Sequence, residues 1–192
     1  SVNIVSKMTG DRFASDGHYE LIELWKAVQQ GWIPPDVITK EDYDLARAGN
    51  VPPYLKAFVG FGCSFSGKYF GGYARNKIER NYAKNAVSSI SKKYPGIKDV
   101  KFSCHDYRSL VFEDCLVYLD PPYGGATGYS VKFNSEEFWN WARQMSMYNT
   151  VIISEYSAPE DFKCIWQKDV HLDIRNKKNK LENRVEKLFM LR

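Results

Sequence analysis

The residues best suited to chemistry are Asp120-Pro121-Pro122-Tyr123, which directly follow the apolar run Leu116–Leu119. This run predicts a buried strand of a parallel sheet, where ligands bind at the carboxyl ends of the strands. Because proline has no N–H to donate to a sheet, we expect the strand to end at Asp120. The Asp120 carboxylate and the Pro121 carbonyl then offer two acceptors, and Tyr123 offers a ring face. This set suits an exocyclic aromatic amine; the alternative is a strand with an ordinary Pro-Pro turn.

A second acidic residue, Asp16, ends a strand predicted over 12–16, just before an amphipathic helix predicted over 19–30. Rossmann-like folds bind a ribose diol with an acid at this position. A carboxylate before a helix is equally typical of an N-cap, which accepts a hydrogen bond from the first turn. These residues alone leave both interpretations of Asp16 open.

The excess of positive charge is concentrated in the middle of the chain. Residues 51–100 hold nine Lys or Arg against two acidic residues, although the net charge of the 192-residue chain is only +4. Within this stretch, residues 60–75 alternate glycines with aromatic and basic residues. The aromatic rings could stack on bases, and Lys68 and Arg75 could contact phosphates. This pattern predicts a polyanion partner. The alternatives are a solvated helix face and a Gly-rich loop that its aromatic side chains pack onto the core.

Several classes of site and location are disfavoured by the sequence. The four cysteines are far apart, with no Cys-x-x-Cys and no histidine at ligand spacing, so no metal site is expected. Cys104 and Cys115 are expected to be reduced thiols in the core, which fits a cytoplasmic protein. No signal peptide and no apolar run of membrane-spanning length is present, so no membrane partner is expected.

Asp120-Pro121-Pro122-Tyr123 after an apolar strand resembles the catalytic motif of amino-group methyltransferases that use S-adenosylmethionine, and the Asp form resembles their DNA adenine-N6 branch. Ser15–Ile22 with Trp25-Lys26-Ala27 is similar to the second motif of phage-type (Dam-like) DNA adenine methylases. The resemblance implies that Asp16 faces the cofactor ribose and that Asp106, with Tyr107, lies at the adenine edge. It also implies a bacterial or phage-encoded enzyme, of the kind found in restriction-modification.

The same resemblance implies a Rossmann-like α/β fold, with a mostly parallel sheet and a C-terminal antiparallel hairpin. Residues 1–30 and 98–192 would form the catalytic domain, and 31–97 would be a target-recognition insertion for double-stranded DNA. The DNA-binding residues expected in the insertion are Lys68, Tyr69, Tyr73, Arg75, Lys77 and Arg80.

The chain begins at Ser1-Val2-Asn3-Ile4, which looks like the tail of the family's Gly-rich cofactor loop. The first strand and most of that loop are therefore expected to be missing, and the chain alone is expected to bind S-adenosylmethionine weakly and to methylate negligibly. Two alternatives stay open. One is a methyltransferase acting on RNA adenine or on a protein amide, and the other is a non-catalytic DNA-binding remnant of such an enzyme.

Overall fold

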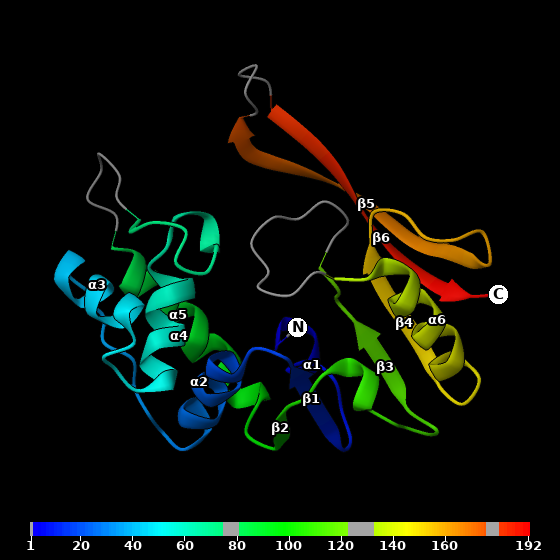
Figure 1. Cartoon of the computed structure of the whole chain (residues 1–192), viewed down its shortest axis with the longest axis horizontal. Coiled ribbons are helices and arrows are strands. Elements are labelled where there is room, and N and C mark those ends of the chain that lie inside the picture. The colour runs from blue at the N-terminus through cyan, green and yellow to red at the C-terminus, as the bar shows by residue number, and fades with distance from the viewer. Residues whose placement is uncertain (1, 75–80, 123–132, 176–180) are drawn as a thin grey trace. The chain divides into compact units, whose positions relative to one another are not determined.

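The computed structural model describes residues 2–74, 81–122, 133–175 and 181–192, without the side chains of residues 66, 170–175 and 181–184. It is a mixed α/β structure whose chain divides into two compact units, Ser1–Leu110 and Val111–Arg192 (Figure 1). Four of the residues predicted to act in catalysis or DNA binding lie outside the described ranges: Arg75, Lys77, Arg80 and Tyr123.

The first unit combines helices with a two-stranded parallel sheet. Its two strands, β1 and β2, pair in register from Arg12 with Val100 to Asp16 with Cys104. In chain order its elements are α1 (Val2–Val5), β1 (Arg12–Asp16), α2 (Tyr19–Gln29), α3 (Lys40–Ala48), α4 (Pro53–Gly62), the 3₁₀ helix η1 (Phe65–Gly67), α5 (Tyr82–Lys93), η2 (Tyr94–Gly96), β2 (Val100–Cys104) and η3 (Tyr107–Ser109).

The helices of the first unit begin where local sequence favours a cap. The run Thr39-Lys40-Glu41-Asp42 predicts a capping box, and Thr39 and Asp42 form one at the start of α3, while Gly49 ends that helix with φ of +87°. Pro53 occupies the first position of α4, where its missing N–H costs nothing. The helices bury one shared apolar core, in which Leu24 and Val28 of α2 meet Ala57 and Phe58 of α4.

The second unit is a four-stranded mixed sheet with one helix. The strand order is β3–β4–β6–β5, in which β3 and β4 are parallel and the remaining neighbours are antiparallel. The elements are β3 (Leu116–Leu119), α6 (Ser135–Ser146), β4 (Thr150–Glu155), β5 (Phe162–Arg175) and β6 (Leu181–Leu191). The long β5–β6 pairing confirms the expected C-terminal antiparallel hairpin.

Three details differ from the sequence prediction. Ser135, followed by Glu136 and Glu137, is expected from the sequence to cap a helix, but the side chain of Asn134 caps α6 by accepting from the backbone N–H of Glu137 at 3.2 Å. Cys104 and Cys115 are half-buried, and the fully buried thiol is Cys63, whose pKa burial raises to about 12. α4 extends to Gly62, into the Gly-rich segment 60–75, and the missing side chain of Gly60 lets the rings of Tyr69 and Phe70 pack directly on the helix. Within the described ranges, no helix is both long and apolar enough to cross a membrane.

Candidate functional site

The Asp-Pro-Pro segment leaves β3 at its carboxyl end. The last pair of the β3–β4 ladder joins Leu119 to Ile153, and the chain then continues into an exposed Asp120 and a buried Pro121. The prolines explain why the ladder stops here, since neither can donate to a neighbouring strand. The Asp120 carboxylate therefore lies at the carboxyl end of the parallel strands, which is where ligands bind in parallel sheets.

Other polar residues also lie at the carboxyl ends of β3 and β4, beside Asp120. Ser154 and Glu155, which end β4, are only 7% and 8% exposed. Burial raises the pKa of Tyr118 on β3; a hydrogen bond to Ser154 opposes this rise, and the charges of Asp120 and Glu186 add to it. Sequence reasoning gave Ser154 and Glu155 no role. The signal available was an acidic residue closing an apolar strand, the same pattern that singled out Asp16.

Asp16 stands at the carboxyl end of β1, exposed to solvent. Its Oδ1 accepts from the backbone N–H of His18 at 2.8 Å, which turns the chain into α2. The N-cap of α2 is His18 itself, whose Nδ1 accepts from Leu21 N at 3.4 Å. Asp16 thus shapes the turn before the helix, and its position is also the one that a ribose-binding acid takes.

Asp106 follows β2, the strand that pairs with β1, and is likewise exposed. Its carboxylate is held at both oxygens by Arg108, with Nε 2.9 Å from Oδ1 and Nη2 2.6 Å from Oδ2. Hydrogen bonds from the Arg108 side chain and backbone lower the pKa of Asp106 to about 2. Tyr107 lies between them, half-buried, with the Arg108 guanidinium 6.0 Å from its ring centre.

A charged cluster that the sequence did not indicate adjoins Asp16. Glu20 in the first turn of α2 forms an ion pair with Lys56 of α4, with 3.2 Å between Oε1 and Nζ. Burial opposes ionisation of Glu20, but its backbone hydrogen bond together with Lys56 and His18 lowers its pKa. Because Lys56 lies 36 residues beyond Glu20, only the packing of α4 on α2 reveals this pairing.

Two tyrosines of the Gly-rich segment, Tyr69 and Tyr73, pack inward. The Tyr69 ring meets those of His18, Phe61 and Phe70 at centroid distances of 4.5, 4.7 and 4.7 Å. Its hydroxyl is buried with no hydrogen-bond partner among the described residues, and burial, with the charge of Glu20, raises its pKa to about 12. Tyr73 donates through its hydroxyl to the Ile38 carbonyl at 2.7 Å. These two rings contribute to packing within the first unit.

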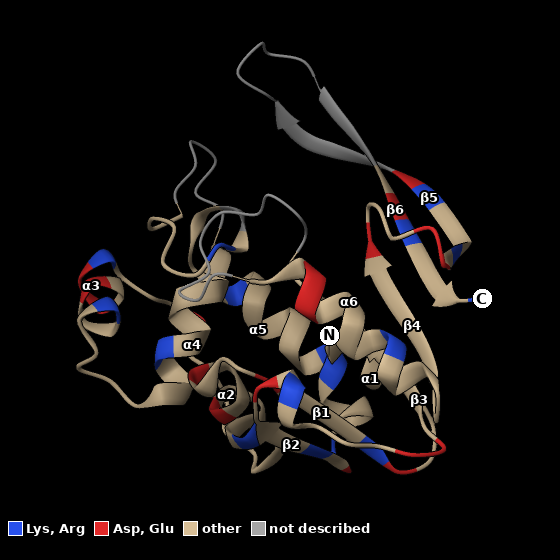
Figure 2. Ribbon diagram, turned by 45° about the vertical axis from the view of Figure 1, so that its right-hand side comes forward, with Lys and Arg blue, Asp and Glu red and all other residues tan. Residues whose placement is uncertain are grey.

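Other residues of this segment face solvent. Lys68 is exposed, as is Phe65 at the start of η1, which is 64% exposed and was not singled out by sequence reasoning. The backbone on both sides of Lys68 and Tyr69 is tightly turned, with Gly67 at φ of +68° and Phe70 at φ of +46°, a value that is uncommon for a bulky residue. Figure 2 shows that Lys and Arg of the described residues are distributed over several elements, including α3, α4, β1 and β2.

The two units therefore each bring candidate residues to the carboxyl ends of parallel strands: Asp16 and Asp106 in the first, and Asp120 with its buried polar neighbours in the second.

No model of a known protein family matches the chain, and a search of curated proteins found no match.

Proposed function

We propose that the chain provides the catalytic motif and the nucleoside side of the cofactor site of a DNA adenine-N6 methyltransferase that uses S-adenosylmethionine. The observation that carries the proposal is the position of Asp120-Pro121-Pro122 directly after a parallel strand, with the carboxylate exposed and the first proline buried. A carboxylate fixed on so stiff a segment suits an acceptor that must be in place before its substrate arrives.

The strand pairings support a Rossmann-like fold as the finer description. The usual order of such a sheet is 3-2-1-4-5-6. If β1, β2, β3 and β4 are its second to fifth strands, the parallel pairs β1–β2 and β3–β4 are both accounted for. β1 and β3 each have one edge without a partner among the described strands.

In this proposal Asp16 binds the ribose hydroxyls of S-adenosylmethionine, while Asp106 and Tyr107 contact its adenine. Asp16 and Asp106 are exposed and follow neighbouring parallel strands, which is where a nucleoside is bound in Rossmann-like folds. Asp106 binds its ligand by sharing or exchanging the hydrogen bonds that Arg108 now supplies. The cofactor supplies an electrophilic methyl group.

The chemistry follows from the adenine amino group, whose lone pair is delocalised into the ring and is a poor nucleophile. The Asp120 carboxylate and the Pro121 carbonyl would each accept a hydrogen bond from one of its two N–H groups. These hydrogen bonds would localise the lone pair on nitrogen and direct it at the methyl donor. No covalent intermediate with the protein is needed, and the raised pKa of Cys63 is consistent with a thiol that stays protonated. The base must leave the duplex to reach this position, and the Tyr123 ring would stack on it.

For the DNA itself, the proposal relies on the exposed Lys68 and Phe65, together with Arg75, Lys77 and Arg80 of the same basic segment. Lysine and arginine bind phosphates without regard to sequence, and an exposed aromatic ring can stack on a base. Tyr69 and Tyr73 would act indirectly, by holding the segment on α4 and on the residues around Ile38.

The function is tested by measuring transfer of a labelled methyl group from S-adenosylmethionine to duplex DNA, followed by hydrolysis and identification of the labelled base. The chain is assayed as it stands and with an amino-terminal extension that supplies a strand and a Gly-rich loop. We expect N6-methyladenine from the extended chain. Label in RNA or protein but not in DNA, or no label with any acceptor, would contradict the proposal.

A further inference from the structure

The first unit contains a basic pocket far from the residues discussed so far. The pocket has a volume of about 360 Å³, close to the lower end of the range for small-ligand sites. It is lined by side chains from α1 and the residues after it, from the end of α5, and from η2: Asn3, Ser6, Lys7, Ser89, Lys92, Lys93 and Gly96. Three of these are lysines, the "pocket lysines" Lys7, Lys92 and Lys93, and none is acidic.

The position of the pocket separates it from the proposed methyltransferase site. Lys7 precedes β1 and Gly96 precedes β2, so the pocket adjoins the amino ends of the two parallel strands. Asp16 and Asp106 lie at or beyond the carboxyl ends of the same strands. Each strand has five residues, which at about 3.3 Å per residue places the two sites at opposite ends of the sheet.

The convergence of the three lysines requires an explanation beyond helix capping. Lys92 and Lys93 are in the last turn of α5, where cations interact favourably with the helix dipole. That effect does not account for Lys7, which comes from a different segment and adds a third positive charge. Burial, and then the charge of Lys92, lower the pKa of Lys93, which donates to the Ser89 carbonyl at 3.3 Å. An anion in the pocket would relieve this repulsion.

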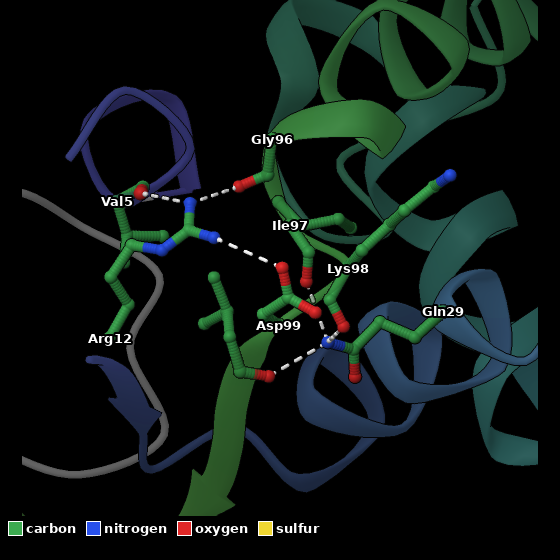
Figure 3. Close-up of polar contacts among 8 residues, drawn as sticks. Val5, Arg12, Gln29, Gly96, Ile97, Lys98 and Asp99 are labelled. Carbon is green, nitrogen blue, oxygen red and sulfur yellow. Dashed lines mark hydrogen bonds and ion pairs between the residues drawn. The ribbon is translucent and has the colours of Figure 1, made fainter. Parts of the chain in front are cut away.

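Hydrogen bonds from two side chains hold the backbone beside the pocket at and after Gly96 (Figure 3). The Arg12 guanidinium donates to the Gly96 carbonyl at 2.6 Å and to the Val5 carbonyl at 3.5 Å, which ties the end of α1 to η2. Gln29 donates through Nε2 to three carbonyls of the next residues, those of Ile97, Lys98 and Val100. A pocket held in this way loses little freedom when a ligand enters.

Close backbone contact completes the wall. A Cβ added at Gly96 would lie 2.3 Å from the Ser6 carbonyl oxygen, so the two segments that form the pocket touch here. Ser6, Ser89 and Asn3 add neutral polar groups to the lining. Ser6 Oγ donates to the Asn3 carbonyl at 3.4 Å, and Ser89 Oγ accepts from Lys93 Nζ, so a ligand would share or replace these hydrogen bonds.

We propose that this pocket binds a phosphate group, carried either by a small phosphorylated molecule or by a nucleic-acid backbone. Lysine ammonium groups and hydroxyls are the donors that phosphate oxygens accept from, and the lining contains no carboxylate to repel them. The site is independent of the proposed methyl transfer, because it shares none of that site's residues.

The test is a titration of the full chain with inorganic phosphate, pyrophosphate or a short DNA duplex, followed by backbone amide NMR. We expect saturable shifts at Ser6, Lys7 and Gly96, with pyrophosphate binding more tightly than phosphate. Replacing the pocket lysines together with glutamine should weaken binding at least roughly tenfold. The matched control replaces three exposed lysines of the same unit that do not line the pocket, and it should bind normally: Lys84, Lys98 and Lys101.

The two sources of phosphate are separated by the same titrations. Shifts with pyrophosphate that the duplex does not reproduce assign the pocket to a small phosphorylated ligand, whereas tighter, salt-sensitive shifts with the duplex assign it to a backbone phosphate. If neither probe shifts these amides, or if the control variant loses binding as much as the pocket variant does, the proposed site is wrong. The dispersion of each variant's amide spectrum shows whether it is folded.

Discussion

At the scale of residues, the carboxylates singled out by the sequence occur in different environments. Asp16 accepts one backbone hydrogen bond and faces solvent, Asp106 is held at both oxygens by Arg108, and Asp120 is exposed with a charge that adds to the burial-raised pKa of Tyr118. A ligand of Asp106 must therefore compete with a guanidinium that already binds both carboxylate oxygens. Asp106 was singled out because it follows a predicted strand. That position does not indicate that the Arg108 guanidinium, two residues later, binds its carboxylate.

The hold of Arg108 on Asp106 predicts a measurable change in pKa. In Arg108→Ala, the pKa of Asp106 should rise from about 2 toward its ordinary value of 3.8, because its largest stabilising hydrogen bond is lost. The folded-state pKa lies below the unfolded one, so the pair stabilises the fold above about pH 4 and loses this effect as the pH falls toward 2. The contribution to stability is small, since the pair is exposed.

NMR titration of side-chain carboxyl groups measures this pKa directly. Arg143→Ala is the matched control, because it removes a similar pair with Asp161 in the second unit and should leave Asp106 unchanged. An unaltered Asp106 pKa in Arg108→Ala would show that the ion pair does not form in solution.

At the scale of elements, the Gly-aromatic segment is organised by its packing on α4. The Gly60 carbonyl accepts from Phe70 N at 3.0 Å, and a Cβ at Gly60 would lie 2.4 Å from Tyr69 Cε2 and 2.8 Å from Phe70 Cε2. The glycine is therefore needed for two rings to approach the helix, and not for a flexible loop.

Gly60→Ala should accordingly lower the free energy of unfolding by about 1–3 kcal/mol through overpacking, despite alanine's better helix propensity. Denaturant titration is the measurement. The control is Gly17→Ala, where an added Cβ meets nothing within 4 Å, and a change within about 0.5 kcal/mol is expected. Equal stability of the two variants would mean that the rings do not pack on Gly60.

Elements with a strong local signal could be predicted from the sequence. The capping residues of α3, the proline at the start of α4 and the prolines after β3 act through the backbone of their own neighbours. The sequence left inward packing of the aromatic side chains open as an alternative, but the contact of Tyr69 with His18 could not be predicted, because the two residues are far apart in the chain. The ion pair of Glu20 with Lys56 was missed for the same reason.

At the scale of the whole molecule, the sequence predicted a mixed α/β structure, and the two sheets confirm that class. It predicted one mostly parallel sheet, whereas the described strands form a parallel pair and a separate mixed sheet, much of which is the long β5–β6 hairpin. The order of strands in a sheet depends on pairing between segments that are distant in the chain, and the hydrophobic periodicity of the sequence does not determine that pairing. It is this order, with open edges at β1 and β3, that gives the Rossmann-like proposal its support.

The central claim is that Asp120 positions an adenine amino group for methylation, and one comparison tests it most directly. Methyl transfer from S-adenosylmethionine to duplex DNA is measured for the chain with the amino-terminal extension described above, with and without Asp120→Ala. DNA affinity is measured alongside, by fluorescence anisotropy. We predict a loss of methyl transfer of at least roughly 100-fold, because the carboxylate acts on the transition state, with DNA affinity changed only a few-fold. Methylation by Asp120→Ala at close to the unsubstituted rate would contradict the account.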